Sequence, residues 1–326
     1  MRSSARSPAE TRFPPLLVIC GPTATGKTAL SLAVAEALPG TEIVSADSRQ
    51  VFRGMDVGTA KVGSTERARI PHHGLDLVEP DQPFSAADYR RHALGALEGI
   101  AGRGGLAVLV GGTGLYLRAV ARGLPLDEVD HDRPLRAELE AALAQHGLPA
   151  LVDELRRLAP VSAARTDLAN PRRVVRALER VRLQGDTPPP LPRGYPGPVS
   201  WLGLDTAAAT NDVWIAERAR WQFANGLLDE AAALAARFDR GLPAFSAMGY
   251  REALAVLDGS LSHEEALELT ARRTRQFARR QRTWFRREAD VEWLDARDEN
   301  KPRAIAVARA LVVEAATRER GSRARR

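Results

Sequence analysis

The sequence contains a single cysteine, Cys20, among its 326 residues. One thiol cannot form an intramolecular disulfide, and it cannot supply a zinc site that needs several cysteines. The chain also lacks any apolar run near the ~20 residues that span a bilayer. Its first 15 residues lack the apolar stretch of a secretory signal. These absences predict a cytoplasmic protein with no membrane segment.

Lysine is almost as scarce, with only Lys27, Lys61 and Lys301 against 44 arginines. A codon bias toward arginine accounts for the ratio itself, so the positions that remain lysine are candidates for a specific role. The 47 basic residues outnumber the 41 acidic ones, for a net charge of +6. Such a balance favours polyanionic partners, nucleic acid among them.

Short apolar runs alternate with helical patterns in the first 124 residues, which is typical of a parallel α/β sheet flanked by helices. Ser85 and Asp88 have the spacing of a helix-capping box. We expect strands at residues 16–20, 41–45, 75–78 and 106–110, and helices at 28–38 and 86–102.

From about residue 125 the pattern changes. Residues 132–184 show helical periodicity only, and residues 187–198 contain six prolines, which is typical of a stiff linker. Strands are expected again at 201–204 and 291–294, within an otherwise helical remainder. We therefore predict a catalytic core over residues 14–124 and 196–317, an inserted all-helical domain over 125–195, and disordered tails at 1–13 and 318–326.

Residues 21–28 fit the phosphate-loop pattern G-x-x-x-x-G-K-[ST], directly between an expected strand and an expected helix. The loop consists of Gly21, Pro22, Thr23, Ala24, Thr25, Gly26, Lys27 and Thr28. Its backbone amides would surround phosphate oxygens, Lys27 would neutralise their charge, and the Thr28 hydroxyl would bind Mg2+. The pattern predicts a phosphate or diphosphate ligand, but it does not distinguish ATP from an organic diphosphate.

The acidic partner that usually accompanies such a loop is missing. A phosphoryl-transfer enzyme holds Mg2+ with an acid at the end of a buried strand, but the strand at 106–110 ends in Gly111-Gly112-Thr113. Asp47 follows the strand at 41–45, and ligands of open α/β sheets bind outside the carboxyl ends of strands. Asp47 is therefore a candidate magnesium ligand or general base, unless it only caps the following turn.

Further segments give the chain a resemblance to the tRNA dimethylallyltransferases, the isopentenyl-tRNA transferase family. The matching stretches, besides residues 21–28, are 46–61, 70–73, 84–90, 111–116, 170–179, 248–251 and 273–285. They occur in the order of the family and lie within residues 16–295. The resemblance implies a P-loop NTPase-like parallel sheet flanked by helices, with an inserted all-helical domain and a helical C-terminal part.

The resemblance also implies a reaction. The N6 amine of the adenosine at tRNA position 37 would attack C1 of dimethylallyl diphosphate and release diphosphate, which the phosphate loop would hold as the leaving group. Asp47 would accept the N6 proton, Thr23 would contact the bridging region of the diphosphate, and Arg218 would reach the phosphates from the helical side. Mg2+ is the expected cofactor. For Arg218 the alternative is an ordinary solvated helix face.

Contacts to the tRNA anticodon stem-loop follow from the same resemblance. They fall on Asp47, Ser48, Arg49, Gln50, Thr113, Arg172, Arg173, Arg176, Met248, Gly249, Tyr250 and Arg251. The three arginines at 172–176 belong to an arginine-rich segment at 172–182, and residues 272–287 hold eight more arginines. The alternatives are a solvated face for each cluster, a core position for Tyr250 and a strand-end turn for Thr113.

Other positions have simpler expectations. Lys61 is expected near the tRNA or at the surface. Phe277, Trp284 and Phe285 share a helical face that we expect to pack into the core. His72 and His73 form no metal-ligand set with other histidines and are interpreted as structural.

Two other function classes remain open from the residues alone. A P-loop kinase would transfer phosphate from ATP to a small acceptor, and an RNA-binding ATPase or chaperone would use the basic clusters without prenyl chemistry. The missing acid at Gly111 counts against both. We expect a monomer.

Overall fold

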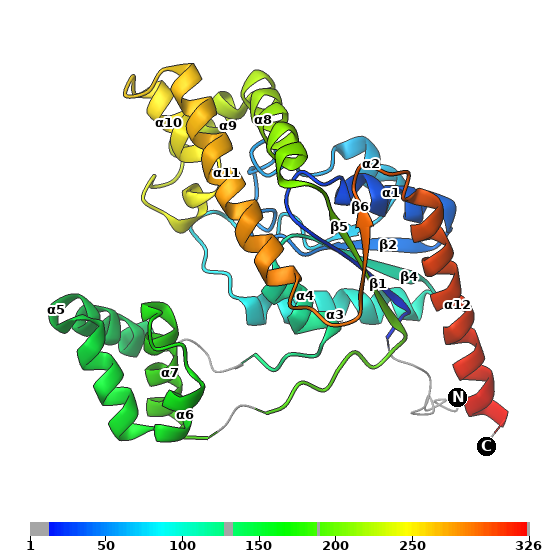
Figure 1. Ribbon diagram of the computed structural model, residues 1–326, viewed down its shortest axis with the longest axis horizontal. Coiled ribbons are helices and arrows are strands. Elements are labelled where there is room, and N and C mark those ends of the chain that lie inside the picture. The colour runs from blue at the N-terminus through cyan, green and yellow to red at the C-terminus, as the bar shows by residue number, and fades with distance from the viewer. Residues whose placement is uncertain (1–12, 127–132, 188–189, 325–326) are drawn as a thin grey trace, which may run out of the picture. The chain divides into compact units, whose positions relative to one another are not determined.

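The computed structural model describes residues 13–126, 133–187 and 190–324 (Figure 1). The predicted tail at residues 1–13 lies outside them apart from Phe13, whose ring meets Tyr195 edge-on. The chain divides into two compact units, residues 1–124 with 193–326, and residues 125–192. We call them the core unit and the helical unit. The sequence predicts the insertion over 125–195, and the structure ends it at residue 192.

The core unit is built on six parallel strands in the order β3-β2-β4-β1-β5-β6. The strands are β1 (Leu16–Cys20), β2 (Thr41–Ser45), β3 (His72–His73), β4 (Leu106–Val110), β5 (Val199–Asp205) and β6 (Val291–Asp295). All five residues of β1, β2 and β4 are buried, as expected when helices cover both faces of a parallel sheet.

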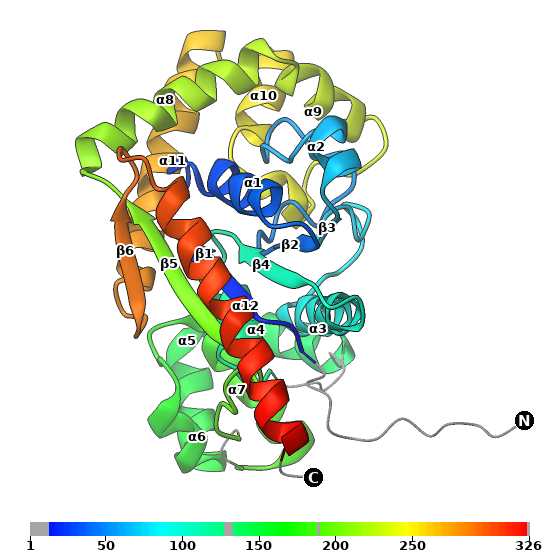
Figure 2. The same ribbon diagram turned by 90° about the vertical axis from the view of Figure 1, so that its right-hand side faces the viewer.

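Helices cover the sheet on both sides (Figure 2). Leu17 and Ile19 of β1 pack with α1 (Lys27–Ala37) and α12 (Lys301–Ala324). Val18 and Cys20 point the other way, toward α3 (Ala86–Gly102) and α4 (Gly114–Ala121). The alternation follows from the two-residue period of a strand, and it gives the sheet a separate apolar core on each face.

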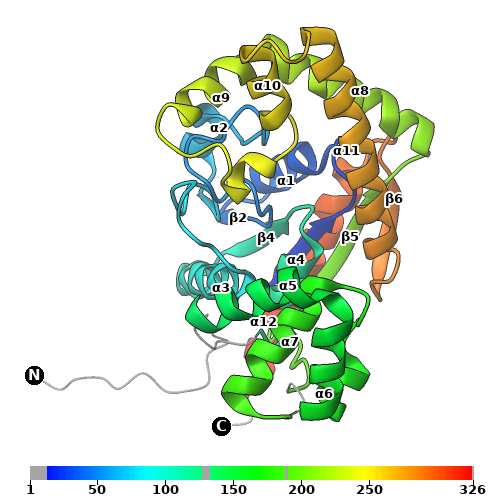
Figure 3. The same cartoon turned by 90° about the vertical axis from the view of Figure 1, so that its left-hand side faces the viewer.

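A second group of helices lies beyond the carboxyl ends of the strands (Figure 3). It consists of α8 (Ala208–Ala224), α9 (Leu227–Ala235), the 3-10 turn η1 (Pro243–Ser246), α10 (Tyr250–Leu257) and α11 (His263–Phe285). The short α2 (Ser64–Arg69) precedes β3. α8 follows the carboxyl end of β5, and the phosphate loop follows the carboxyl end of the neighbouring parallel strand β1. The group of helices and the phosphate loop therefore lie at the same edge of the sheet.

Two local predictions are corrected. The strand expected at 75–78 is instead the two-residue β3, and Val78 only bridges Phe52. The tail expected to be disordered at 318–326 continues α12 as helix through Ala324, because alanine, arginine and glutamate are strong helix formers. The pair between Arg318 and Glu314, at 2.5 Å, supports that last stretch.

The helical unit comprises α5 (Arg133–Leu158), α6 (Pro160–Arg165) and α7 (Pro171–Gln184). α5 is broken at Gly147, whose φ of +76° is outside the helical range. Leu139, Leu155 and Leu178 are among the residues of the unit's own apolar core. Asn170 caps α7 by accepting hydrogen bonds from the backbone amides of Arg172 and Arg173. In the described ranges no helix combines the length and apolar composition that a membrane crossing requires.

Lys61 proves to be a buried structural cation. Its side chain is 1% exposed, and its amine donates to the Phe52 carbonyl at 2.6 Å, to Asp56 at 2.7 Å and to Asp76 at 2.6 Å. Burial by itself would raise the pKa of Asp76, but Lys61 and Arg67 hold it below its usual value. Lys61 therefore joins three separate backbone segments and does not face a ligand.

Replacing this lysine tests its structural role. Lys61→Met leaves Asp56 without its cation and Asp76 with Arg67 alone, so we expect the free energy of unfolding to fall by about 2–3 kcal/mol in urea denaturation. The matched control is Lys301→Met, because Lys301 is exposed at the start of α12 and should change stability by about 0.5 kcal/mol or less. Equal effects of the two substitutions would show that the buried contacts of Lys61 do not stabilise the fold.

Candidate active site

The phosphate loop has the backbone that its glycines permit. Gly26 has a φ of +80°, and α1 begins at the next residue, Lys27. Gly21 has a φ of +136°, and a Cβ on it would lie 2.1 Å from the Leu204 carbonyl oxygen. Thr25 closes the loop by donating to the Pro22 carbonyl at 2.9 Å. The loop therefore presents the amino end of α1 to an anion.

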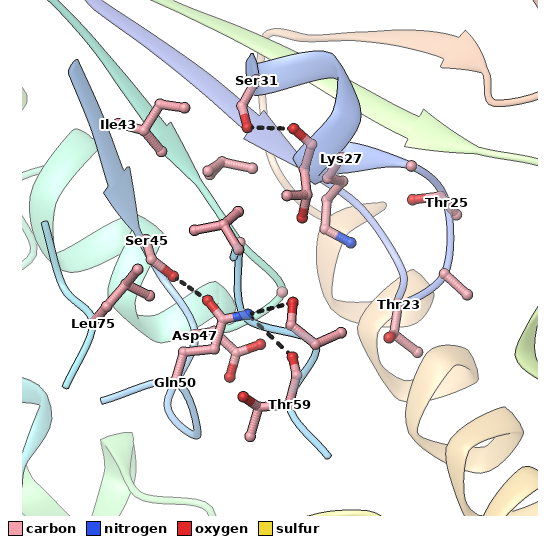
Figure 4. A pocket seen from close by; sticks show the side chains of 18 of the residues that line it. Thr23, Thr25, Lys27, Ser31, Ile43, Ser45, Asp47, Gln50, Thr59 and Leu75 are labelled. Carbon is pink, nitrogen blue, oxygen red and sulfur yellow. Dashed lines mark hydrogen bonds between the residues drawn. The ribbon is translucent and has the colours of Figure 1, made fainter. Parts of the chain in front are cut away.

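The Lys27 amine lies inside this loop and donates to the Pro22 carbonyl at 2.5 Å. Burial and, less strongly, the positive charge of Arg218 lower the pKa of Lys27 to about 8, although Asp47 acts in the opposite direction. Figure 4 shows Lys27 and Asp47 projecting into the same cavity from different elements. An anionic ligand would restore the protonated state that burial disfavours.

Asp47 follows the end of β2 and belongs to a tightly bonded turn. Its Oδ1 accepts from the backbone amide of Arg49 at 2.8 Å, and the amide of Ser48 donates to the Thr113 hydroxyl at 3.0 Å. Gln50 accepts from the Ser45 hydroxyl at 2.7 Å and donates to the Thr59 carbonyl at 3.1 Å. The turn thus fixes the Asp47 carboxylate beside the carboxyl ends of β2 and β4.

Two helices beyond the sheet contact the phosphate loop. Arg218 of α8 donates to the Thr23 hydroxyl at 3.1 Å and to the Thr59 carbonyl at 3.4 Å. Gln281 of α11 accepts from the Thr23 amide at 2.9 Å and donates to the Gly112 carbonyl at 2.9 Å. Burial lowers the pKa of Arg218, although Asp47 counteracts this shift. Arg218 therefore faces the loop and not solvent.

Two adjoining cavities meet at these residues. The first, of about 200 Å³, is lined by the phosphate loop, and we call it the loop cavity. The second, of about 170 Å³, is lined by the 47–49 turn, Thr113 and Met248, and we call it the turn cavity. Both are lined by Thr23, Asp47, Thr59, Gly112, Arg218, Phe277 and Gln281. A ligand in one cavity would thus share its contacts with a ligand in the other.

Comparison with known proteins identifies this arrangement. A family model described as IPP transferase matches residues 50–288. The chain belongs to the IPP transferase family. The tRNA dimethylallyltransferase of Anaeromyxobacter sp. strain K is 46% identical over 284 residues, covering 86% of this chain and 92% of that protein. The one from Salinispora tropica is 45% identical over 287 residues, covering 85% and 87%.

Solved structures agree with the family and confirm the P-loop NTPase-like fold. The full-length tRNA isopentenylpyrophosphate transferase of Bacillus halodurans matches with a TM-score of 0.68 and 36% identity, covering 94% of this chain and 99% of that one. A eukaryotic dimethylallyltransferase acting on tRNA matches with a TM-score of 0.76 and 25% identity, covering 90% and 77%.

Within this IPP transferase, most of the residues expected at the site do gather there. Thr23, Asp47, Ser48, Arg49, Gln50, Thr113, Arg218 and Met248 line one or both cavities. The Arg49 guanidinium donates to the Pro243 carbonyl at 3.0 Å and to the Ser246 hydroxyl at 2.9 Å. Arg251 is exposed at the start of α10.

Tyr250 is the clearest departure from an expected tRNA contact. Its ring is 0% exposed and belongs to the apolar core, and Gly249 beside it is buried. The Tyr250 hydroxyl donates to Glu230 of α9 at 2.5 Å. Of the two interpretations left open by the sequence, the structure therefore supports the core position.

Several cavity residues were missed in the sequence. Thr59 and Gln281 lie within the family-like stretches 46–61 and 273–285, but the sequence predicts no role for them, and Gln222 lies in none of those stretches. Their contacts with Arg218, Thr23 and Val57 join distant parts of the chain. Phe277 was expected in the core but lines both cavities, whereas Phe285 is 1% exposed and does pack in the core. His72 lines the loop cavity, and burial lowers its pKa. In the described ranges no cluster of three metal-ligating side chains occurs.

The three arginines expected at the anticodon stem-loop belong to the helical unit. That unit carries a cavity of its own, the arginine cavity, lined by Arg136, Arg165, Arg172, Arg173, Arg176 and Arg180 with Asp167. Arg176 pairs with Glu179 at 2.8 Å, and Glu179 is fully buried. This buried pair holds Arg176 in place at the wall of the arginine cavity.

The pKa of Lys27 makes diphosphate binding depend on pH. An organic diphosphate is fully ionised above pH 7, whereas Lys27 in the free protein loses its proton above about pH 8. If only the protonated amine binds, the Kd should rise about tenfold between pH 7 and pH 9 in calorimetric titrations.

The control is Lys27→Arg, because a guanidinium stays charged over this range and should give a flat profile. A flat profile for the unmodified protein would contradict the assignment of Lys27 as the titrating phosphate ligand.

Proposed function

We propose that this protein transfers a dimethylallyl group from dimethylallyl diphosphate to N6 of the adenosine at position 37 of tRNA, releasing diphosphate. The observation that carries the proposal is the meeting of two cavities at Thr23, Asp47 and Arg218, one of which is lined by a phosphate loop. The names of its relatives support the same chemistry.

The donor belongs in the loop cavity. The amides at the start of α1 and the Lys27 amine would hold the diphosphate, with C1 directed toward the shared residues. Negative charge grows on the diphosphate as the C1–O bond breaks. Arg218, whose guanidinium already contacts the Thr23 hydroxyl at 3.1 Å, would stabilise that charge together with Lys27. Fixed donors are effective here because they need no reorganisation during the reaction.

The acceptor adenine belongs in the turn cavity. An adenine amine is a weak nucleophile, so its position and the removal of its proton both matter. Asp47 lines both cavities and is held by the Arg49 amide, so it can accept the N6 proton as the N–C1 bond forms. A base inside a stacked loop cannot reach such a cavity, and the adenosine would therefore be flipped out.

Mg2+ fits the loop cavity as a proposed cofactor. The Thr28 hydroxyl lines the same cavity as the phosphate loop. Mg2+ is usually held by one or two protein oxygens together with substrate phosphates and water, so this single hydroxyl would suffice on the side of the protein. When bound, the ion would neutralise part of the diphosphate charge.

The tRNA anticodon stem-loop is the proposed macromolecular substrate. In the helical unit, six arginines and one carboxylate line the arginine cavity, a balance suited to the phosphates of the stem. In the core unit, Ser48, Thr113 and Met248 line the turn cavity and would contact the nucleotides next to the adenosine. We propose that the protein acts in the cytoplasm as a monomer.

A kinase reaction fits the site less well. β4 ends at Val110 and is followed by Gly111, which carries no acid, and the acid at the end of β5, Asp205, is paired with Arg282 at 2.8 Å. Asp205 does not line the loop cavity. The relatives also favour the transferase over the kinase.

The function is tested with an unmodified anticodon stem-loop that carries adenosine at position 37. It is incubated with the protein, Mg2+ and dimethylallyl diphosphate in the absence of ATP, and analysed by mass spectrometry. We expect that adenosine to gain one dimethylallyl group. For Asp47→Asn, the transfer rate should fall by about 10²–10⁴-fold, because the variant lacks the base, while the stem-loop is still bound.

The matched control is Asp258→Asn, since Asp258 is an exposed carboxylate that pairs with Arg240. It should keep the rate of the unmodified protein. Absence of any mass gain, with ATP consumed on a small acceptor instead, would support the kinase. Full activity of Asp47→Asn would remove Asp47 from the mechanism.

A further inference from the structure

Residues 55–61 form a loop that walls both cavities, and we call it the wall loop. Thr59 lines both cavities, Gly58 lines the turn cavity and Ala60 lines the loop cavity. The segment contains no helix or strand, and residues 57–60 form a turn. Its own Lys61 ties it to the Phe52 carbonyl and to Asp76, and Thr59 donates to the Met55 carbonyl at 2.6 Å. Side chains from other elements hold the rest of the loop, and three of them, Glu230, Gln222 and Tyr250, have no role in the mechanism above.

Glu230, in the first turn of α9, holds one side of the wall loop. Its Oε2 accepts from the amides of Asp56 at 2.9 Å and Val57 at 2.8 Å, and its Oε1 accepts from Gly58 at 3.1 Å. Hydrogen bonds from amides to a carboxylate are stronger than those to a neutral acceptor. Gln222 of α8 donates to the Val57 and Gly58 carbonyls at 3.0 and 2.7 Å. We call the Glu230 and Gln222 side chains the clamp.

Tyr250 contacts both the clamp and the wall loop. Its hydroxyl donates to Glu230 Oε1 at 2.5 Å, and its ring packs so closely under Gly58 that a Cβ there would lie 2.4 Å from the ring. Burial raises the pKa of Tyr250, and Glu230 raises it further, so the hydroxyl remains a donor. Gly58 is thus a position where a close approach requires glycine.

The other side of the wall loop is connected to the reacting centre. Ala60 has a φ of +49°, a left-handed conformation that L-residues rarely adopt and that persists only where neighbours enforce it. The Thr59 carbonyl accepts from Arg218 at 3.4 Å and from Gln50 at 3.1 Å. The same Arg218 guanidinium donates to the Thr23 hydroxyl. The orientation of Arg218 therefore depends on where the wall loop holds Thr59.

We propose that Tyr250 and Glu230 are positioning residues for prenyl transfer, which hold the wall loop so that the Thr59 carbonyl aims Arg218 at the departing diphosphate. The inference rests on the proposed function and deepens it. When the clamp loosens, Ala60 relaxes and Arg218 loses one of its two anchors. The phosphate loop keeps its own contacts, so the effect falls on the chemical step and not on donor binding.

The test measures steady-state prenyl transfer by Tyr250→Phe, which keeps the ring and removes only the hydroxyl. We expect kcat to fall about tenfold, the effect of one lost hydrogen bond, with KM for dimethylallyl diphosphate within about twofold of the unmodified protein. The decisive readout is coupling. In an Arg218→Lys background, Tyr250→Phe should change kcat by less than about twofold, whereas its effect on Tm should persist.

A purely structural role predicts the opposite pattern, with the same loss of kcat in both backgrounds. Tyr195→Phe is the matched control. The Tyr195 hydroxyl also donates a hydrogen bond, to the Pro14 carbonyl at 2.7 Å, but Tyr195 lines neither cavity. It should leave kcat unchanged. Glu230→Gln provides an independent variant if Tyr250→Phe does not fold, and it should show the same coupling to Arg218.

The outcomes separate the two proposals. If the unmodified protein and Tyr195→Phe transfer the prenyl group while Tyr250→Phe and Glu230→Gln match them in kcat, the positioning proposal is overturned and the proposed function stands. If kcat falls equally with and without Arg218, the positioning proposal is likewise overturned. If the unmodified protein transfers no prenyl group, the proposed function itself fails.

Discussion

The carboxyl ends of β2 and β4 approach so closely that one position has no room for a side chain. A Cβ on Gly111 would lie 2.1 Å from the Ala46 carbonyl oxygen, and that oxygen also accepts a hydrogen bond from the Thr113 amide at 3.1 Å. Position 111 is where a phosphoryl-transfer enzyme would place its metal-binding acid. No side chain fits there, so no carboxylate can stand at this position. The carboxylate that lines both cavities is Asp47, which follows Ala46 after the end of β2.

The rest of the site is arranged around this close approach by the helices beyond the sheet. Gln281 joins the phosphate loop to the strand end at Gly112, and Arg218 joins the same loop to Thr59. The phosphate loop of this protein is therefore held by uncharged and cationic side chains from α8 and α11. Such surroundings suit a diphosphate that leaves as an intact anion, because they stabilise charge without supplying an acceptor for a phosphoryl group.

The sequence predicts those site residues that can be recognised from their immediate neighbours along the chain. The role of Lys27 is predicted from the eight-residue phosphate-loop pattern, and that of Asp47 from its position after a buried strand. Gln281 lies in the family-like stretch 273–285, but its contact with Thr23 spans 258 residues of sequence, and no local pattern predicts that contact. In the sequence, Lys61 and Tyr250 could both contact the tRNA. In the structure both are buried, and they donate hydrogen bonds to Asp76 and Glu230. Burial of a polar group depends on distant segments, and the sequence alone does not pair them.

The fate of the phosphates tests most directly whether the loop holds a leaving group. During turnover of dimethylallyl diphosphate on an unmodified anticodon stem-loop, phosphorus NMR can follow every phosphorus-containing product. The account predicts one inorganic diphosphate for each prenylated adenosine, with no orthophosphate and no phosphorylated RNA. Orthophosphate in step with turnover, or a phosphoryl group on any acceptor, would contradict it.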